Sequence, residues 1–338
     1  MAQSRTVALA LGSGGARGYA HIGVIQVLEE RGYSIVGVAG SSMGALIGGL
    51  YAAGKLDEFT EWATTLKARD VVRLLDVSMS APGAIHAEKV LGRVREILGE
   101  TCIEDMRIPF TAVATDLAAG RSVWFQHGPV DAAIRASIAI PGVITPLVLN
   151  GRVLVDGGIL DPLPVAPTLS IRADLTIGVS LGAEARENRT PARVGTEPRP
   201  VDEWVGRFRR GTAQFLDRET VKSVVSRFGG HSTGLGLEEV GLDEVSVDEV
   251  SVDEVSLDEG VVDTGRDIAP KIGRLEIMGR SLEVVQSALA RYQLAVYPPD
   301  ILIQVPRKSA RSLDFARATE MIAIGRALTE SALDAEDF

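Results

Sequence analysis

The stretch IVGVAGSSMGALIGG constrains the fold more than any other part of the chain. Its apolar run, residues 35–39, predicts a buried strand, and the small and apolar residues of 43–53 predict a helix directly after it. Ser42 stands in the turn between them, framed by Gly40 and Gly44. A strand that turns sharply into a helix at a serine is typical of a nucleophile elbow, which exposes the hydroxyl for attack.

The Gly-x-Ser-x-Gly pattern alone also fits a tight glycine turn with a bystander serine, because such short patterns recur by chance. Two features favour the elbow. Ala45 and Gly48 keep the departing helix slim where it must pass close to the strand. The helix N-terminus beneath Ser42 also favours negative charge developing there.

A second glycine-rich stretch, GSGGARG, lies between an expected strand at Thr6–Leu11 and an expected helix at 19–31. It is not a dinucleotide fingerprint, because Arg17 stands where the third glycine is needed, and no Gly-Lys-Ser/Thr of a P-loop is present. The backbone N–H groups of Gly14 and Gly15 instead suit an anion-binding nest for an oxyanion. Arg17 is then a positive charge or a structural clamp there; the alternative is a salt-bridged surface residue.

The third motif is VLVDGGILDPLP, in which Asp156 directly follows an expected strand at 153–155. Open α/β sheets place their working residues at the carboxyl ends of strands. The two following glycines allow a sharp turn and the close approach of a second side chain. The alternative is an ordinary Asp-Gly turn.

Taken together, the three motifs resemble those of the patatin-like phospholipase family of acyl hydrolases. The resemblance covers residues 5–180, and includes segments 114–125 and 134–147. It implies an α/β protein with a three-layer α/β/α fold and a central, mostly parallel sheet. It also implies that Ser42 is a nucleophile in a catalytic dyad with Asp156. The family's oxyanion loop matches five consecutive residues here: Gly14, Gly15, Ala16, Arg17 and Gly18.

A serine nucleophile needs a base, and a histidine is the usual one. His231 is the one histidine that follows Asp156, but it stands beside a low-complexity repeat, a poor place for a precisely held group. His21, in the first expected helix, is expected to have a structural role. The simpler hypothesis is that the Asp156 carboxylate accepts the Ser42 proton directly. That mechanism requires neither a metal nor a cofactor, and we expect none.

Three regions are expected along the chain. Residues 5–230 form the catalytic domain, and residues 265–338 form a C-terminal α/β portion that packs on it. Between them, residues 235–262 carry a five-residue acidic repeat, interpreted as a solvated insertion. The repeat departs from the family pattern. Calcium binding by it is disfavoured, because its spacing matches no EF-hand loop.

Later elements follow from periodicity and capping. Residues 281–294 predict a helix with Ser281 as its N-cap, residues 300–306 a strand, and residues 313–330 a terminal helix. Residues 204–227 predict an amphipathic helix, which forms either a membrane-interfacial face or a dimer-forming surface.

Charge and composition exclude several function classes. Residues 238–259 hold ten acidic residues and no basic one, which accounts for the whole net charge of −10. The rest of the chain is balanced, so nucleic-acid binding is not expected. One cysteine excludes an internal disulfide, and with four scattered histidines it predicts no metal cluster. The N-terminal apolar run is too short for a secretion signal, so we expect a cytoplasmic protein, in peripheral contact with the inner membrane or free of it.

The resemblance implies lipid acyl esters as substrates: phospholipids, lysophospholipids or simple carboxylic esters. Residues 138–149, rich in Ile, Val, Leu and Pro, are candidates for an acyl-chain wall or for ordinary core. Two alternative functions stay open at this point. One is a thioesterase or acyltransferase that uses the same dyad, and the other is a non-catalytic scaffold whose acidic repeat binds a partner.

Overall fold

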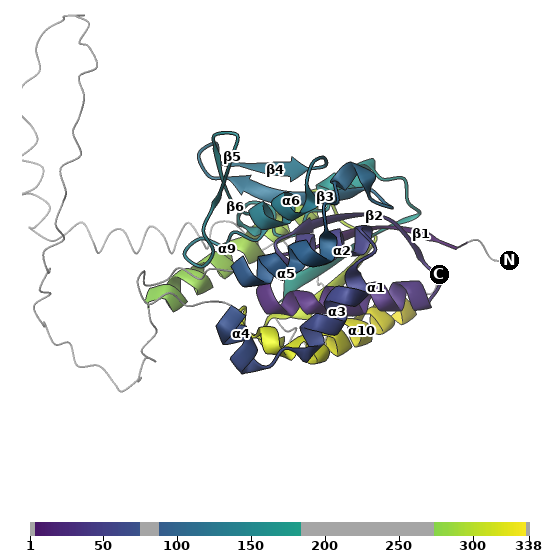
Figure 1. Ribbon diagram of the computed structural model, residues 1–338. Helices are drawn as coiled ribbons and strands as arrows, with labels where there is room; N and C mark the ends of the chain where they lie inside the picture. The colour runs from purple at the N-terminus through teal and green to yellow at the C-terminus, as the bar shows by residue number, and fades with distance from the viewer. Residues whose placement is uncertain (1–3, 75–87, 184–273, 336–338) are drawn as a thin grey trace, which may run out of the picture. The chain divides into compact units, whose positions relative to one another are not determined.

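The computed structural model describes residues 4–74, 88–183 and 274–335 (Figure 1). An eight-stranded sheet runs through this part in the order β5-β6-β3-β2-β1-β7-β8, with β4 also paired to β3. The strands are β1 (Thr6–Leu11), β2 (Ser34–Ser41), β3 (Phe110–Asp116), β4 (Arg121–Phe125), β5 (Leu147–Leu149), β6 (Arg152–Asp156), β7 (Leu175–Ala183) and β8 (Ile301–Pro306).

Eight α-helices and six short 3₁₀ turns connect these strands in the described residues. The helices are α1 (Ala20–Glu30), α2 (Met43–Ala52), α3 (Leu56–Thr65), α4 (Ala68–Leu74), α5 (Glu88–Leu98), α6 (Val130–Ser137), α9 (Arg274–Val296) and α10 (Ala318–Ala335). The 3₁₀ turns are η1 (Gly15–Tyr19), η2 (Ile103–Asp105), η3 (Gly157–Ile159), η4 (Ala166–Ser170), η5 (Arg307–Ser309) and η6 (Phe315–Arg317).

The sheet is mixed but mostly parallel, as expected. Its centre, β3-β2-β1-β7-β8, is parallel throughout, and β4, β6 and β5 add an antiparallel flank. Parallel strands are covered on both faces, so they appear in the sequence as unbroken apolar runs such as TVALAL rather than as alternating patterns. The chain is therefore an α/β protein of the class predicted from its sequence.

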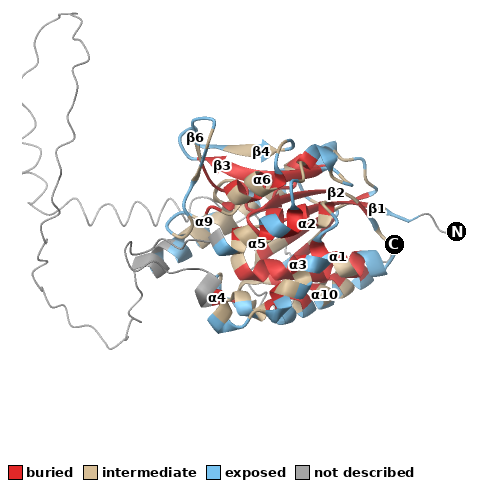
Figure 2. Cartoon of the chain, viewed as in Figure 1, coloured by how far each residue is buried: buried red, intermediate tan, exposed pale blue. Residues whose placement is uncertain are grey.

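Helices cover both faces of the sheet. On one face α1, α2 and α10 enclose the main core, which Figure 2 shows as the buried residues of the strands and of the inward helix surfaces. On the other face Ala10 forms a smaller cluster with Leu163 and Val165, and Leu294 of α9 packs against it. Successive residues of β2 point to opposite faces of the sheet. A Cβ on Gly37 would contact Ile171 after η4, whereas Val38 lies against Gly48 of α2.

The C-terminal elements belong to the same sheet and core. Strand β8 pairs with β7 in parallel, and Met321 of α10 is fully buried in the main core beside α1. The proposed boundaries at residues 230, 235, 262 and 265 lie outside the described residues and stay predictions.

Two expectations about the C-terminal helices were wrong. Ser281 is not an N-cap but lies inside α9, which begins at Arg274, since the residues before Ser281 continue the helix. The terminal helix starts at Ala318 rather than at residue 313, because Asp314 accepts a hydrogen bond from the Arg311 N–H and a 3₁₀ turn follows it. Strand β5, only three residues long, was not anticipated.

The acidic repeat, the expected helix at 204–227, His86 and His231 all lie outside the described residues. Among the helices that are described, none has the length and apolar character needed to cross a bilayer.

Candidate active site

Ser42 occupies a strained turn between β2 and α2. Its φ of 55° and ψ of −120° lie where residues with a Cβ are rarely found, and it shares a positive φ with only one other non-glycine residue that the structure describes, Asn150. The Ser42 carbonyl accepts the first hydrogen bonds of α2, from Ala45 and Leu46. The strain therefore falls on the residue whose hydroxyl the turn presents, as an elbow requires.

Close packing around the elbow explains the glycines of the motif. A Cβ on Gly40 would overlap the backbone of Gly44, and a Cβ on Gly44 would overlap the carbonyl oxygen of Leu11 in β1. Strand and helix thus approach each other at backbone distance, which only glycine permits.

The side chains of Ser42 and Asp156 are in direct contact. The Ser42 hydroxyl donates to Asp156 Oδ2 over 2.5 Å, and the other carboxylate oxygen, Oδ1, accepts the Gly158 N–H at 2.7 Å. Both residues are buried, with 3% and 2% of their surfaces exposed. No histidine stands between them in the described part of the chain. The pair thus has the arrangement of a nucleophile and its base.

The sheet topology explains how residues 114 positions apart meet. Strand β4 takes up one edge of β3, so β2 and β6 must share the other edge. They approach along it from opposite directions: β2 ends with Ser41 opposite Val113, and β6 ends with Asp156 opposite Ala114. The two carboxyl ends therefore face each other one register position apart.

Burial sets the protonation behaviour of Asp156. Removal from water raises the pKa of its carboxyl to about 6, although the hydrogen bonds from Ser42 and Gly158 act in the opposite direction. The carboxylate is therefore still ionised at pH 7, but it is a stronger base than an exposed aspartate. A base with a pKa near the working pH suits proton transfer from a hydroxyl.

The glycine loop follows β1, the strand at which the strand order reverses: β2 and β3 lie on one side of β1 within the sheet, and β7 and β8 lie on the other. Its start is anchored by the Gly12 N–H to the Val179 carbonyl, at 3.0 Å, and by the Ser13 N–H to the Pro162 carbonyl, at 2.8 Å. Ligands of open α/β sheets bind at such switch points, outside the carboxyl ends of the strands. The loop is thus in the expected location for a binding site.

The loop residues differ in which donors they leave available. The Ala16 N–H is already donated to the Ser312 carbonyl at 2.9 Å. The N–H groups of Gly14 and Gly15 have no hydrogen-bond acceptor within the described residues. Gly15 has a φ of 58°, which suits glycine, and a Cβ there would overlap the Ser312 carbonyl. Gly14 and Gly15 are therefore the candidate oxyanion donors of this loop.

Arg17 and Gly18 hold the loop in place. Arg17 is 4% exposed, so it is not a surface residue, and its guanidinium is directed to groups of the protein itself. A Cβ on Gly18 would overlap the Met43 side chain at the start of α2. Gly18 thus lets the loop pack directly against the elbow.

His21 is buried and contacts the backbone of the glycine loop rather than the dyad. Its Nε2 lies 2.9 Å from the Gly12 carbonyl, so this nitrogen carries the proton and donates. Burial lowers the pKa of the imidazole to about 4, and Nδ1 has no partner among the described residues. The ring is neutral at pH 7 and supports the start of the glycine loop, in agreement with a structural role.

The expected acyl-chain wall leads outward from Asp156. The Asp156 N–H donates to the Ala139 carbonyl at 2.9 Å, and Ala139 is the one buried residue of segment 138–149. The apolar side chains beyond it are half-buried or exposed, with Val148 at 67% exposure. Ile138, Leu147 and Leu149 pack against core clusters, whereas Val148 is exposed. Segment 138–149 is therefore partly core, and part of its apolar surface is exposed.

Sequence reasoning missed Ser137, which supports the elbow. Its hydroxyl accepts the Ser42 N–H at 2.8 Å and donates to the Val113 carbonyl at 2.5 Å. Ser137 lies within segment 134–147, which resembles the family, but nothing local indicates this contact. The described residues include no group of three or more His, Cys, Asp or Glu that could hold a metal ion.

Comparison with known proteins identifies the family of the chain. The patatin-like phospholipase family pattern matches residues 9–169, which include the glycine loop, Ser42 and Asp156. An uncharacterized NTE family protein of Mycobacterium tuberculosis is 54% identical over 339 residues, covering 98% of this chain and 92% of that protein. A lysophospholipase of Mycosarcoma maydis, named NTE1, is 35% identical over 193 residues, which are 53% of this chain and 10% of that protein.

Human patatin-like phospholipase domain-containing protein 6 is 32% identical over 186 residues, covering 53% of this chain and 14% of that protein. Among solved structures, VipD from Legionella pneumophila aligns with a TM-score of 0.41 at 15% identity, over 98% of this chain and 67% of that one. The NTE family relative is matched over nearly its whole length. The chain belongs to the patatin-like phospholipase family.

Proposed function

We propose that this protein is a serine acyl-ester hydrolase in which Ser42 is the nucleophile and Asp156 its general base. The observation that carries the proposal is the direct hydrogen bond between the Ser42 hydroxyl and Asp156 Oδ2, made at a strained elbow. A hydroxyl held this way loses its proton to the carboxylate as it attacks a carbonyl carbon. Among the described serines, only Ser42 both has a positive φ at a strand–helix turn and donates to a carboxylate whose pKa is raised to about 6.

Acylation follows from the arrangement. Asp156 Oδ2 accepts the Ser42 proton while Oγ bonds to the ester carbonyl carbon, and the carbonyl oxygen becomes an oxyanion. The N–H groups of Gly14 and Gly15 stabilise that oxyanion; a donor in this role contributes about 3 kcal/mol in comparable enzymes. The intermediate then collapses, the bond to the alcohol oxygen breaks, and Asp156 returns the proton to the departing alcohol.

Deacylation repeats these steps with water. Asp156 takes a proton from water, whose oxygen attacks the acyl-serine carbonyl, and the same donors stabilise the second oxyanion. When the intermediate collapses, the proton passes to Ser42 and the fatty acid leaves. The Asp156 carboxylate is held throughout by the Gly158 N–H, which keeps Oδ2 directed at the reacting oxygen.

We propose lipid acyl esters, of the lysophospholipid or phospholipid type, as the substrate class. The apolar segment 138–149 is partly exposed, and its Ala139 carbonyl accepts the Asp156 N–H, which supports a role as a surface for an acyl chain. Relatives named lysophospholipase and phospholipase domain-containing protein point in the same direction.

Covalent labelling tests the nucleophile. A fluorophosphonate probe is expected to form one stable adduct on the purified protein, and peptide mass spectrometry should place it at Ser42. Preincubation with an acyl ester should slow the labelling, because both compete for the same hydroxyl. A protein that acts only as a scaffold would remain unlabelled, and that result would reject the proposed function.

The pH dependence of hydrolysis tests the base. Because Asp156 must be ionised to accept a proton and its pKa is about 6, kcat/KM is expected to rise with pH, reach half its maximum near pH 6 and level off above it. A carboxyl group ionises with almost no enthalpy change, so the midpoint should hardly move between two temperatures. A midpoint that shifts strongly with temperature would indicate an imidazole base instead.

A further inference from the structure

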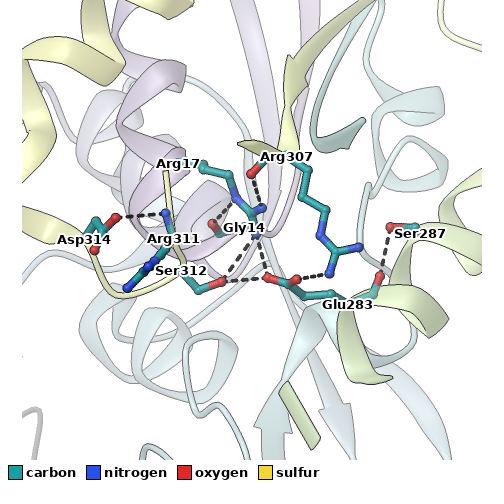
Figure 3. Close-up of polar contacts among 8 residues, drawn as sticks. All are labelled: Gly14, Arg17, Glu283, Ser287, Arg307, Arg311, Ser312 and Asp314. Carbon is teal, nitrogen blue, oxygen red and sulfur yellow. Dashed lines mark hydrogen bonds and ion pairs between the residues drawn. The ribbon is translucent and has the colours of Figure 1, made fainter. Parts of the chain in front are cut away.

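The glycine loop is tied to the C-terminal part of the chain through one buried cation. Figure 3 shows the Arg17 guanidinium surrounded by Gly14, Glu283, Arg307 and Ser312. Arg17 Nε donates to the Gly14 carbonyl at 3.1 Å and Nη1 to the Arg307 carbonyl at 3.1 Å. Nη2 donates to Glu283 Oε1 at 3.1 Å and more weakly to the Ser312 hydroxyl.

The bond from Arg17 to Gly14 orients a candidate oxyanion donor. In a trans peptide the C=O of one residue and the N–H of the next point in opposite directions. Holding the Gly14 carbonyl toward Arg17 therefore turns the Gly15 N–H away from it, leaving that N–H without a protein partner in the described residues. Arg17 thus acts on the peptide plane and not on a substrate oxygen.

Glu283 of α9 is the carboxylate that balances this cation. Its Oε1 also accepts the Ser312 hydroxyl at 2.8 Å, and its Oε2 accepts from Arg307 Nη2. Burial raises the pKa of Glu283, but the Ser312 hydrogen bond and the charges of Arg17 and Arg307 outweigh it and leave that pKa lowered. Ser312 in turn accepts the Ala16 N–H with its carbonyl, so Glu283 and the loop share two intermediaries.

We propose that Glu283 is a positioning residue for the oxyanion loop: through Arg17 and Ser312 it sets the direction of the Gly15 N–H. The inference rests on the proposed hydrolase function. Glu283, Arg307 and Ser312 all lie outside residues 9–169, the part matched by the family pattern. An uncompensated buried cation is costly, so without Glu283 the guanidinium is expected to turn toward water and release the Gly14 carbonyl.

The primary test is Glu283→Gln, which keeps the shape of the side chain and removes its charge. We expect kcat for a p-nitrophenyl ester to fall by about 10- to 100-fold, the effect of a slightly misplaced catalytic group, with little change in KM. The affinity for a trifluoromethyl ketone, which forms a tetrahedral adduct with serine, should fall by the same factor, because the adduct uses the oxyanion donors.

A double-mutant cycle separates positioning from general stability. Arg17→Lys keeps a charge but loses the planar fork that reaches Gly14 and Glu283 together. If Glu283 acts through Arg17, the double variant should be little worse than the poorer single variant. Ser312→Ala, which removes one hydrogen bond to Glu283 and no charge, should lower kcat less. It allows the proposal to be judged even where Glu283→Gln folds poorly.

The matched control is Glu30→Gln. Glu30 of α1 accepts two hydrogen bonds from Arg326 of α10, so it also joins the C-terminal part to the body, but at an exposed place outside the site. It should leave kcat and inhibitor affinity unchanged. Unchanged kcat in Glu283→Gln, a rise in KM alone, or additive effects in the cycle would overturn the inference. Hydrolysis that survives Ser42→Ala, measured in parallel, would instead reject the underlying function.

Discussion

Replacing Ser42 with alanine is expected to abolish ester hydrolysis and phosphonate labelling together. The change removes the hydroxyl that donates to Asp156 Oδ2 and leaves the elbow with a methyl group. In serine hydrolases, loss of the nucleophile lowers kcat on the order of 10⁶-fold, which leaves only the background that binding and oxyanion donors provide. Initial rates on a p-nitrophenyl ester, measured at high enzyme concentration, would show the loss.

Ser41→Ala is the matched control for this variant. Ser41 is the preceding residue and is fully buried, but its hydroxyl donates to the Asp161 carbonyl at 2.6 Å and not to Asp156. We expect it to lower the free energy of unfolding by about 1 kcal/mol, as for a lost hydrogen bond, while labelling at Ser42 and most of the turnover persist. Turnover by Ser42→Ala near the wild-type rate would show that another residue is the nucleophile.

Asp156→Asn is expected to lower kcat on the order of 10⁴-fold while leaving the fold intact. Asparagine fills the same space and can still accept the Gly158 N–H through its amide oxygen, but it cannot take a proton from Ser42 at neutral pH. The magnitude is taken from serine hydrolases in which the catalytic aspartate has been replaced. Circular dichroism and the thermal unfolding midpoint should show that the variant is folded.

Asp156→Asn is expected to stabilise the fold although it lowers activity. The Asp156 pKa is raised from 3.8 to about 6 in the folded protein, so folding at pH 7 buries a carboxylate at a cost. A difference of roughly two units corresponds to about 3 kcal/mol. We therefore expect Asp156→Asn to increase the free energy of unfolding at pH 7 by up to that amount. The gain should decrease as the pH falls below 6, where the folded carboxyl becomes protonated, and should be small near pH 4, close to the unfolded pKa of 3.8.

Denaturant unfolding of both proteins at pH 7 and pH 4 would measure this difference. A variant that is inactive but more stable at pH 7 would show that the wild type keeps a buried, ionised carboxylate at a cost in stability because catalysis needs it. A variant that is inactive and less stable at both pH values would mean that Asp156 mainly supports the fold, and its assignment as the base would have to be withdrawn.

Local structure near the site could be predicted from the sequence because short-range sterics govern it. The expected strand Thr6–Leu11 coincides with β1, and the helix expected at 43–53 with α2, since apolar runs and tight glycine turns leave few other conformations. Weaker signals failed further along. Ser281 looked like an N-cap because serine favours that position, yet the residues before it are helical as well. Strand β5 has only three residues and gives no periodic pattern.

Asp156 illustrates a correct location predicted for an incomplete reason. We expected it at the carboxyl end of a strand in a parallel sheet, but β6 is antiparallel to β3. It lies beside Ser42 because β3 is longer than its pairing with β2, which leaves an edge for β6 to occupy from the other end. The pairing of an edge depends on the lengths of three strands, and no single motif contains that information.

The sequence by itself determined the chemical groups of the site: a serine at an elbow, a carboxylate at a strand end, and a glycine loop between a strand and a helix. These are local features, since backbone sterics act over a few residues. The tertiary structure alone decided which groups meet, because contacts between distant residues arise only when the sheet assembles. Thus it joined Ser42 to Asp156 without a histidine, turned His21 to the Gly12 carbonyl, and brought Glu283 of α9 to the buried Arg17.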